Sequence, residues 1–561
     1  MSAEFRTRSL FGRRARRGRG LVAAVAVTAG LLLAGVSGCA RNPELLGADA
    51  IVLDPGYVAF PEATRLTLIA DGLNAPSDFG FVPASADVPE AFKGAMVIAE
   101  PVTASEPVRV GGFKADGEWF ELYPRAFRLA GIQLGGDRLY GPVGGVAVLG
   151  SEVFLSHRDR EGRGVISALT FPSEGRPPKR RIVVENLPAA GDHGVTDVAV
   201  NPTNGRIYFG VGSATNSGVV GLDSFQLGWV RKHPKVADQS LTELRLRGYR
   251  FDTPRPGSGL FASNLAVTGP FQPFGQTRQR IAPSDRPTGA VYSVAADGSD
   301  LRVEAHGLRW PRGLAFNEFG NLYVSNNGME LRGTRPVASD PDVVLRVPLL
   351  AGSRRATWFG FPDFSADLQP VTLPQYQPPT ELIEKTGYPE LSFLVDHEAS
   401  GLVAPDSATL LRGVLPPQAG AAKMAVVGRD AVVPVPEGHV LVAAFGDRGQ
   451  FANADTPRET PAGSEVWTID TDRKSASRLI YNRVPGPASE SYAQPIALER
   501  PVSVKVGPDG AVYVLDAGPV SFSRGRPRAE SNKGRIFKLD AAPVPASTSP
   551  ADDPSASSPA E

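Results

Sequence analysis

The chain has 561 residues, of which 42% are hydrophobic, and its 59 basic side chains balance 59 acidic ones. That length and apolar content suffice for one or two domains with a large core. The charge balance excludes the strongly basic composition of many nucleic-acid-binding proteins, and the single cysteine excludes an internal disulfide.

The first 38 residues have the order of an export signal. Seven arginines lie within residues 1–20, an apolar run extends from Leu21 to Ala34, and small residues precede Cys39. The apolar run is too short to span a bilayer comfortably, so we predict a cleaved signal peptide over residues 1–38. Its removal leaves 52 basic and 58 acidic residues, a net charge of −6.

Residues 36–39, "VSGC", resemble the lipobox of bacterial lipoproteins. The resemblance implies a diacylglycerol on the Cys39 thiol, and the alternative is a chance cysteine after an ordinary signal. Several acyl chains give lasting membrane attachment, because each buried CH₂ contributes about 0.8 kcal/mol. We therefore expect a lipid-anchored, extracytoplasmic protein on the periplasmic or surface face of a bacterial membrane, with residues 39–63 as a tether.

A hairpin pattern recurs six times in the following part of the chain. Each copy has an alternating apolar strand, a turn with Asn, Asp, Gly or Pro, and a second apolar strand. The copies cover residues 77–101, 144–159, 196–213, 312–328, 424–449 and 502–518. Further strands are expected within residues 289–307, 342–360, 464–482 and 534–540.

A hairpin with two further strands is a four-stranded sheet, and six such sheets bury their faces when they pack radially. We therefore predict an all-β fold, a six-bladed β-propeller with long inter-strand loops over residues 64–540. A pair of β-sandwiches or a β-helix fits six hairpins less well. The strand at 65–73 is expected to pair with 534–540 and close the ring.

Two long loops and the C-terminal segment stand outside this pattern. The loops, 216–288 and 361–423, are expected on one face of the propeller, where such loops build the site. Residues 541–561 consist of Pro, Ser, Ala, Thr, Val and acidic residues. They hold too little apolar surface to offset the entropy of ordering, so we predict a disordered tail.

The residues just before the first strand of each copy are expected to crowd around one mouth of the propeller channel. These lead-in residues are Asn74, Tyr140, Asp192 with His193, Arg309, His397 and Arg500. A neutral imidazole accepts a proton near pH 7, and a guanidinium stabilises negative charge without titrating. The pair His193 and Arg309 therefore suits removal of a proton from a hydroxyl while a hydride leaves. Alternatively, both residues only hydrogen-bond the loops at the blade tips.

Other residue types near the same mouth allow further interpretations. Glu330, Asp340 and Asp342 follow the strand that ends in "SNNG", and they could contribute to a Ca²⁺ site or simply be solvated. Trp310 and Trp358 could stack on a sugar or a flat cofactor, or pack in the core. The sequence has no serine-nucleophile elbow, no zinc-binding H-E-x-x-H helix and no phosphate-binding P-loop.

Four segments resemble the soluble quinoprotein glucose dehydrogenase family and its sorbosone dehydrogenase relatives. They are "LPAAGDHGVTDVAVNPTNGRIYFGVGSATN" from residue 187, "HGLRWPRGLAFNEFGNLYVSNNG" from 306, "WFGFP" from 358 and "RPVSVKVGPDGAVYVLD" from 500. Members of this family are six-bladed propellers that use pyrroloquinoline quinone (PQQ) and Ca²⁺. The similarity spans roughly residues 65–540.

The resemblance implies roles for the residues that match the family's motifs. His193, with Asp192 beside it, would be the general base. Arg309 would contact the quinone and the reacting oxygen, and Arg500 would contact the carboxylates of the quinone.

The chain departs from the family pattern at several positions. The family has Asn and Gln beside its arginine, and this chain has Trp310 and Arg312 at those positions. Trp310 and Arg312 would therefore line the cofactor site. Ser213 replaces the acidic residue that orients the base. Gly328 and Met329 fall where the family's backbone carbonyls hold Ca²⁺, so the resemblance places a calcium ion there.

The resemblance implies a quinoprotein dehydrogenase that oxidises an aldose, a sorbosone-like compound or a related sugar or alcohol with PQQ. The electron acceptor is not evident from the sequence. One alternative is a non-catalytic binding propeller that has lost the cofactor. Another is a Ca²⁺-dependent lactonase, which would need clustered acids at the channel. No basic cluster that would bind nucleic acid remains after the signal.

Overall fold

The computed structural model describes residues 42–103, 108–123, 127–129, 132–134, 139–173, 176–254, 265–349, 355–386, 390–447, 460–491, 496–523 and 526–543. The predicted signal peptide, Cys39 and residues 544–561 of the predicted tail lie outside these ranges. The described residues from Pro43 onward form one compact unit. Within the described ranges, no helix has both the length and the apolarity needed to cross a bilayer.

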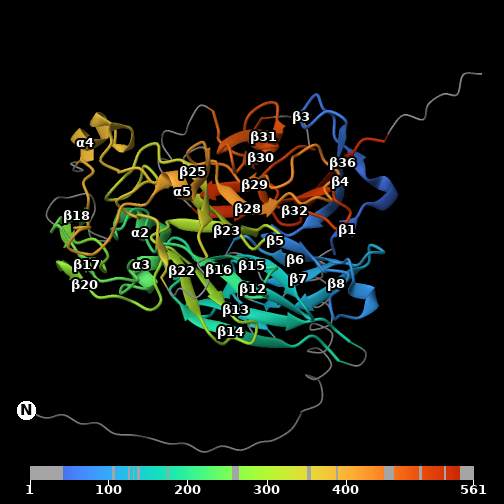
Figure 1. Ribbon diagram of the computed structural model, residues 1–561, viewed down its shortest axis with the longest axis horizontal. Coiled ribbons are helices and arrows are strands. Elements are labelled where there is room, and N and C mark those ends of the chain that lie inside the picture. Colours follow the sequence, from blue (N-terminus) through green and yellow to red (C-terminus); the bar gives the residue numbers. More distant parts are fainter. Residues whose placement is uncertain are drawn as a thin grey trace, which may run out of the picture. The chain divides into compact units, whose positions relative to one another are not determined.

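Six mainly antiparallel sheets form a six-bladed β-propeller, as predicted (Figure 1). Blade 1 contains β5 (Asp78–Phe81), β6 (Met96–Glu100), β7 (Arg109–Phe113) and β8 (Trp119–Tyr123). Blade 2 contains β11 (Val146–Leu149), β12 (Glu152–Arg158), β13 (Gly164–Thr170) and β14 (Arg180–Leu187). Blade 3 contains β15 (Val195–Val200), β16 (Ile207–Val211), β21 (Ala290–Val294) and β22 (Arg302–His306).

The second half of the ring repeats this arrangement. Blade 4 contains β23 (Trp310–Phe316), β24 (Leu322–Asn327), β25 (Asp342–Val347) and β27 (Leu411–Leu415). Blade 5 contains β28 (Ala421–Val426), β29 (Val440–Ala444), β30 (Glu465–Asp470) and β31 (Ser475–Asn482). Blade 6 contains β32 (Pro501–Val506), β33 (Val512–Asp516), β36 (Gly534–Ala541) and β4 (Thr64–Leu73). The first strands of successive blades are neighbours around the whole ring.

The last blade joins both ends of the folded chain. β4 pairs with β36, with Leu68 opposite Phe537 and Leu66 opposite Leu539, which confirms the predicted closure. The structure also orders much of the segment predicted as a tether: β1 (Glu44–Leu45) and β2 (Ile51–Val52) pair with β4, and β3 (Val58–Ala59) pairs with β31. These short strands cover outer blade edges whose backbone groups would otherwise be unpaired.

The segment 342–360 does not form one continuous pair of strands, in contrast to the prediction. After β25 the chain leaves blade 4, and β26 (Thr357–Trp358) pairs in parallel with β22 of blade 3. The outer strand of blade 4 is β27, which follows the long loop. The loop therefore interrupts blade 4 rather than connecting blades 4 and 5.

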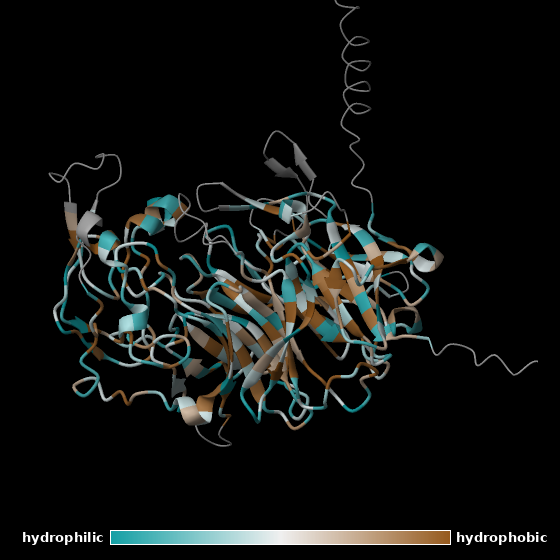
Figure 2. Cartoon of the chain, turned by 90° about the horizontal axis from the view of Figure 1, so that it is seen from above, coloured by the Kyte–Doolittle hydropathy of each residue, from teal (hydrophilic) through white to brown (hydrophobic). Residues whose placement is uncertain are grey.

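An apolar layer fills each interface between neighbouring blades. For example, Phe154 and Ile166 of blade 2 pack with Ile207 and Phe209 of blade 3, and corresponding clusters lie between the other pairs. Figure 2 shows the same pattern as brown strands within more hydrophilic loops. Strand alternation supplies an apolar face on each side of a blade, as radial packing requires.

Two buried carboxylates join neighbouring blades near the channel axis. Asp78 of β5 accepts hydrogen bonds from Val146 N of β11 (2.9 Å) and from Ser503 Oγ of β32 (2.7 Å). Asp197 of β15 accepts a hydrogen bond from Leu314 N of β23 (2.8 Å). Lys505 of β32 lies 3.7 Å from Asp78 and balances part of this buried negative charge.

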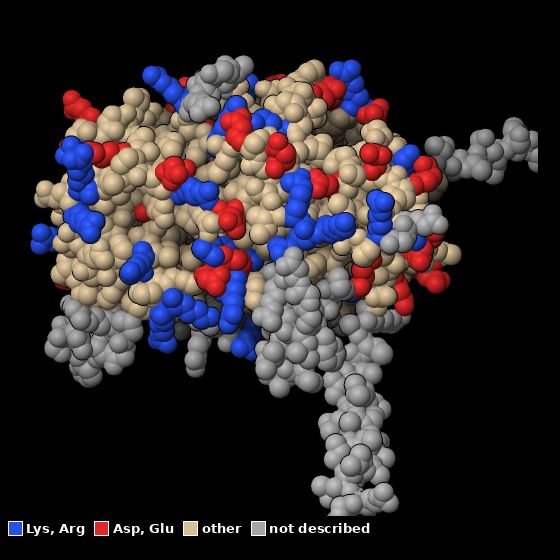
Figure 3. All heavy atoms as spheres, turned by 90° about the horizontal axis from the view of Figure 1, so that it is seen from below, with Lys and Arg blue, Asp and Glu red and all other residues tan. Residues whose placement is uncertain are grey.

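Glycine at one inner-strand position permits close approach of the blades. A Cβ atom on Gly313 would lie 2.2 Å from the carbonyl oxygen of Ala422 in blade 5. A side chain at this position would therefore separate β23 from β28. On the protein face in Figure 3, acidic and basic side chains are interspersed.

The long loops carry short elements of their own beside blades 3 and 4 (Figure 1). The first loop contains α2 (Leu222–Leu227), α3 (Trp229–Lys232), β17 (Leu244–Arg245), β18 (Phe251–Pro254), β19 (Leu265–Thr268) and β20 (Arg280–Ile281). The second contains α4 (Thr380–Thr386) and α5 (Ser407–Leu410). Both loops share one apolar cluster, in which Leu244 and Phe271 pack with Leu394 and Val395.

The remaining elements lie at the blade edges or within shorter connections. They are the hairpins β9 (Phe127–Leu129) with β10 (Ile132–Leu134) and β34 (Val520–Ser523) with β35 (Arg526–Ala529), helix α6 (Ala488–Ser491), and the 3₁₀ turns Gly47–Asp49 and Glu90–Phe92. A third 3₁₀ turn, Pro374–Tyr376, lies in the second long loop.

Candidate functional site

Most of the predicted lead-in residues do precede the first strand of a blade. Asn74, Tyr140, His193, Arg309 and Arg500 come shortly before β5, β11, β15, β23 and β32, respectively. The side-chain amide of Asn74 is buried and has no hydrogen-bond partner in the described part of the chain. These positions confirm the expected placement at the start of five blades.

His397 is the exception, and its predicted place at the channel mouth is wrong. Because β27 returns to blade 4 after the long loop, the chain reaches β28 through Ala419 and Gly420 instead. His397 lies within the loop, where its Nε2 is 3.0 Å from Asp363 Oδ2 and its ring packs against Phe393. It belongs to the folded loop rather than to the lead-in residues.

The backbone carbonyl of Ser213 orients the His193 imidazole. His193 is only 4% exposed, and its Nδ1 lies 3.0 Å from Ser213 O and 3.1 Å from Ser213 Oγ. The hydroxyl of Ser213 donates its own proton to Thr215 O at 2.6 Å. Nδ1 is therefore the protonated nitrogen that donates to the carbonyl, which leaves the lone pair of Nε2 as the proton acceptor.

Burial and neighbouring cations keep this imidazole neutral. Desolvation, followed by the guanidinium groups of Arg309 and Arg332, lowers the pKa of His193 well below its usual value of 6.5. The contact with the Ser213 carbonyl opposes this effect. At neutral pH the side chain is in the form that can accept a proton.

Asp192 faces a buried arginine. In the described part of the chain, no hydrogen bond joins its side chain to His193. Its Oδ2 accepts a hydrogen bond from Arg332 Nη2 at 2.8 Å. The other guanidinium nitrogens of Arg332 bond to Glu330 and to Asp223 of α2. One arginine thus ties the segment before β15 to the first long loop and to the segment after β24. The sequence offered no motif that singled out Arg332 or Asp223.

Arg309 is held on one side and has a free nitrogen on the other. Its Nε donates to Asn216 O at 3.0 Å, and its Nη2 donates to Asn216 Oδ1 at 2.9 Å and lies 3.4 Å from Glu330 Oε1. The third nitrogen, Nη1, is buried without a hydrogen-bond partner among the described residues. A buried, unpaired guanidinium nitrogen is costly, so this group is suited to an acceptor atom on a ligand.

A continuous arc of aromatic rings and guanidinium groups runs across blades 3 to 6. We call His193, Trp310, Arg312, Phe445 and Arg500 the mouth arc. The His193 and Trp310 ring centroids are 4.6 Å apart, and the Arg312 guanidinium lies 4.9 Å from the Trp310 ring and 5.0 Å from the Phe445 ring. The Arg500 guanidinium lies 5.4 Å from the Phe445 ring. The structure therefore brings four of the predicted site residues together, with Phe445 as a member that the sequence did not indicate.

The mouth arc and Arg309 have the chemistry that a flat, polyanionic quinone requires. Arg312 also donates to Gly420 O at 3.1 Å, and Arg500 donates to Gly446 O at 2.8 Å and lies 3.2 Å from Glu490 Oε1. Aromatic and guanidinium planes provide stacking surfaces, and the guanidinium groups offset carboxylate charge. The unpaired Nη1 of Arg309 is the observation that fits PQQ most directly.

The predicted acidic calcium ligands are each engaged elsewhere. Asp340 accepts hydrogen bonds from Met329 N (2.7 Å) and Ala366 N, and Asp342 accepts one from Gly328 N (3.0 Å). Burial raises the pKa of Asp340 to about 8. Within the described residues no group of three or more His, Cys, Asp or Glu side chains gathers to hold a metal. A calcium ion on the carbonyls of Gly328 and Met329 stays a prediction.

Comparisons with known proteins gave matches among solved structures only. No family model matches the chain, and no curated protein matches its sequence. The PQQ domain of pyranose dehydrogenase from Coprinopsis cinerea, in its holo form, is similar over 87% of this chain and 98% of its own length, with 14% identity and a TM-score of 0.47.

Two bacterial structures are similar over comparable lengths. An oxidoreductase described as a glucose dehydrogenase, from Thermus thermophilus, is 16% identical and covers 85% of this chain and 99% of its own, with a TM-score of 0.42. The PQQ-bound aldose sugar dehydrogenase from Streptomyces coelicolor is 14% identical and covers 86% and 99%, with a TM-score of 0.42. The solved structures that this chain resembles thus include PQQ-dependent sugar dehydrogenases, and its six blades are established by its own sheet topology.

Proposed function

We propose that this protein is a quinoprotein dehydrogenase that oxidises an aldose, a sorbosone-like compound or a related alcohol with PQQ. One observation carries the proposal: a neutral, buried histidine with a free Nε2 lies beside an arginine that has an unpaired, buried nitrogen. In such an oxidation the substrate hydroxyl loses a proton and the carbon that bears it loses a hydride. The histidine would accept the proton, and the arginine would offset the negative charge that develops on the oxygen. The resemblance of the surrounding segments to the quinoprotein family supports the same conclusion.

Four residues would hold the cofactor. Arg309 and Arg500 would bind its carboxylates or quinone oxygens, and Trp310 and Arg312 would contact its flat face. When bound, PQQ supplies the hydride acceptor.

His193 would remove the proton from the substrate hydroxyl through Nε2, since Nδ1 is committed to Ser213. Arg309 would offset the negative charge that develops on the substrate oxygen. General-base help of this kind contributes about 10² to 10⁴ in rate. Asp192 acts at a distance in this scheme, because it holds Arg332, and Arg332 holds Glu330 beside Arg309.

The test is a titration of PQQ, with Ca²⁺ present, into the chain from residue 39 onward carrying Cys39→Ser, followed by quinone absorbance. The proposal expects saturable binding that weakens at least tenfold in Arg309→Ala and is unchanged in Arg346→Ala. Arg346 is an exposed arginine of β25 and serves as the matched control. The absence of binding by the folded wild-type protein would overturn the proposal.

Activity is tested separately with a panel of sugars and an artificial electron acceptor. We expect His193→Ala to bind PQQ but to lose most of the turnover. Full turnover in that variant would exclude His193 as the base.

A binding propeller without redox chemistry is the second candidate. It is favoured by Ser213 in place of the acidic residue of the family and by the engagement of Asp192 with Arg332. Saturable sugar binding in a protein that binds no PQQ would support this alternative. A Ca²⁺-dependent lactonase would hydrolyse a lactone without an acceptor, but the described residues contain no acid cluster that would hold its metal.

We also propose that the protein is lipid-anchored through Cys39 outside the cytoplasm. The basic, apolar and small-residue order of the first 39 residues supports the anchor. Mass spectrometry of the N-terminal peptide from membranes tests it. A mature chain with an unmodified Cys39 would contradict the proposal.

A further inference from the structure

Arg158, the last residue of β12 in blade 2, lies close to the channel mouth but is not part of the mouth arc. An isolated bridge pairs its backbone with that of the lead-in residue Tyr140: Arg158 N donates to Tyr140 O at 3.0 Å, and Tyr140 N donates to Arg158 O at 3.2 Å. The guanidinium lies against Gly194, where a Cβ atom would be 2.7 Å from Arg158 Nη2. Gly194 follows His193 directly in the chain, so this cation contacts the residue next to the candidate base.

The Arg158 side chain has no partner of opposite charge within the described part of the chain. Its Nε is buried without a hydrogen bond, and no hydrogen bond or ion pair joins its terminal nitrogens to a described residue. The residue as a whole is partly exposed, and only Nε is both unpaired and sealed from solvent. Burial lowers the pKa of the guanidinium, and no carboxylate of the described residues opposes this effect. A partly buried charge without a partner is costly, so the group is suited to an anion that arrives from solvent.

The acidic residue next to Arg158 in sequence is not its counter-ion. Asp159 accepts hydrogen bonds from the backbone N (2.8 Å) and from Nε (2.7 Å) of Arg163 in the turn that follows β12. Another buried arginine of the blades is paired directly: Arg109 Nε lies 2.8 Å from Glu100 Oε2. The unpaired state of Arg158 is therefore not the rule for arginines in these blades.

The position of Arg158 on blade 2 separates it from the arginines of the proposed cofactor site. Arg309 and Arg312 lie at the start of blade 4, and Arg500 precedes β32 of blade 6. His193 precedes β15 of blade 3, which lies between blades 2 and 4. The candidate base thus stands between Arg158 and the cofactor arginines, and Arg158 is left for a second anion.

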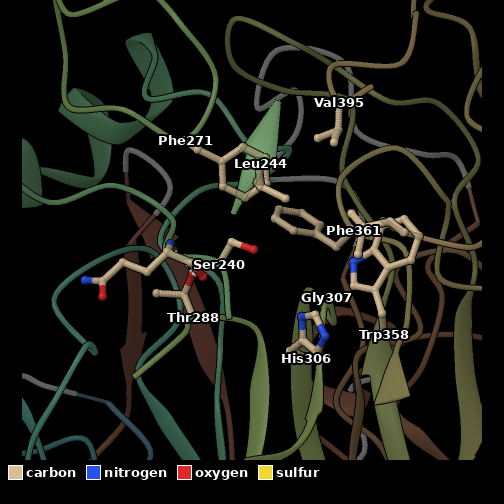
Figure 4. Close-up of a pocket in the computed structure, with 11 residues that line it drawn as sticks. Ser240, Leu244, Phe271, Thr288, His306, Gly307, Trp358, Phe361 and Val395 are labelled. Atoms are coloured by element: carbon tan, nitrogen blue, oxygen red, sulfur yellow. Dashed lines mark hydrogen bonds between the residues drawn. The ribbon is translucent and has the colours of Figure 1, made fainter. Parts of the chain in front are cut away.

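The pocket between blade 3 and the long loops offers no alternative place for a sugar (Figure 4). Its lining includes His306, Trp358 and Phe361, and Arg158 is not among the lining residues. The free space inside it holds only about one or two water molecules. A sugar ring therefore does not fit there.

We propose that Arg158 binds the carboxylate of the substrate, and that the substrate is accordingly a sugar acid. The inference rests on the proposed dehydrogenase function for the kind of reaction, and on Arg158 for the charge of the ligand. A guanidinium holds a carboxylate through two parallel charge-assisted hydrogen bonds. In this arrangement Arg158 fixes the acidic end of the sugar, while a hydroxyl of the same molecule reaches His193 Nε2.

The experiment is a calorimetric titration at pH 7 with two probes that have the same sugar ring. D-Glucuronate carries a carboxylate, and D-glucuronamide carries a neutral amide in its place. Each probe is added to the protein without PQQ and to the protein loaded with PQQ. We expect saturable binding of D-glucuronate and about tenfold weaker binding of D-glucuronamide, because hydrogen bonds to an ionised acceptor are stronger. This comparison uses the wild-type protein and depends on no variant.

Three variants test whether Arg158 is the residue that recognises the charge. Arg158→Met keeps an apolar stem without the guanidinium, and we expect about tenfold weaker binding of D-glucuronate with little change for D-glucuronamide. Arg158→Lys keeps the charge but loses the planar fork, so its affinity for D-glucuronate should lie between those of Arg158→Met and the wild type. Arg160→Met is the matched control, because Arg160 is an exposed arginine of the same turn, and it should bind as the wild type does.

The affinity of each variant for PQQ separates the two sources of a carboxylate. We expect it to stay at the wild-type value in Arg158→Met. If folded Arg158→Met loses affinity for PQQ but not for D-glucuronate, Arg158 belongs to the cofactor site and the proposal is wrong.

Equal affinity of the wild-type protein for both probes, or no saturable binding of D-glucuronate with or without PQQ, would also overturn the proposal. Unchanged D-glucuronate binding in folded Arg158→Met would do the same. If the protein binds no PQQ, the dehydrogenase proposal fails, and the titration of the PQQ-free protein still decides whether Arg158 recognises a sugar acid.

Discussion

The imidazole of His193 lies over the indole of Trp310, with 4.6 Å between ring centroids and 32° between ring planes. The two residues belong to different blades, so this contact fixes the candidate base relative to the next blade. Trp310 also carries the Arg312 guanidinium beside its ring at 4.9 Å. One indole therefore positions both a proton acceptor and a cation at the channel mouth.

Removing this indole should impair the site more than the fold. We expect Trp310→Ala to weaken PQQ binding and to lower turnover by tenfold or more, because both neighbours lose their stacking surface. Trp310→Phe retains a ring and should restore most of the activity. The measurements are PQQ affinity and kcat for both variants, and equal loss in the two would show that stacking is not the cause.

Replacement of Arg332 should destabilise the protein strongly. Arg332→Met leaves Asp192, Asp223 and Glu330 buried without their shared cation. Breaking a buried ion pair from one side costs about 3–5 kcal/mol. Denaturant unfolding measures the change in free energy of unfolding.

The matched control for that experiment is Arg429→Met. Arg429 pairs with Glu318 and Glu437 on the surface, where solvent screens the charges, and we expect a much smaller change in the free energy of unfolding. Equal decreases in the free energy of unfolding for both variants would show that the buried ion pairs of Arg332 contribute no more to stability than surface ion pairs do.

Stability should depend on pH through Asp340. Burial raises its pKa to about 8 in the folded protein, whereas its usual pKa is 3.8. The folded state therefore holds a proton that the unfolded state has lost, and this contribution to stability decreases as pH rises from about 4 to 8. The pKa values of His193 and His306 are lowered in the folded protein, so their contribution to stability increases as pH rises. This increase ends near their usual pKa of 6.5, above which both states hold the neutral imidazole.

Comparison with Asp340→Asn between pH 6.5 and 7.5 isolates this effect, because Asp197 and Glu465, whose pKa values burial raises to about 7, are present in both proteins. A single group contributes at most about 1.4 kcal/mol per pH unit there. We expect the free energy of unfolding of the wild type to fall relative to Asp340→Asn across this window. Parallel pH profiles for the two proteins would show that Asp340 is already ionised in the folded state.

Truncation of Phe537 tests the closing blade. Phe537 is fully buried in β36, opposite Leu68 of β4, and Phe537→Ala should cost about 3–5 kcal/mol. Phe319 is 69% exposed, so Phe319→Ala should change the stability by no more than about 0.5 kcal/mol. Thermal or denaturant unfolding compares the two, and similar values would contradict closure through β36.

The sequence predicted those parts of the fold that depend on local pattern. Alternation and turn residues located all six hairpins, and the strand character of residues 65–73 was enough to predict ring closure. The fourth strand of blade 4 was missed because it follows a long insertion, and sequence distance no longer indicates which sheet a strand joins. Because of the same insertion, His397 was wrongly predicted to lie at the channel mouth.

The site was predictable where a residue directly precedes an inner strand, as for His193 and Arg309. Contacts between loops were not predictable, because they depend on how the long loops fold over the blades. Arg332 is far in sequence from Asp192 and Asp223, and Phe445 is far from Arg312 and Arg500. None of Arg332, Asp223 and Phe445 lies in a motif. The hydrogen bond between Asp192 and Arg332 is a contact of this kind.

The pairing of β4 with β36 also has a consequence for biosynthesis. Residues 64–73 and 534–541 must meet, so the ring stays open until almost the whole propeller has been made. Contacts between such distant segments form slowly, because the loop must close before any pairing energy is gained. Until then the emerging chain presents unpaired strand edges, which favour aggregation.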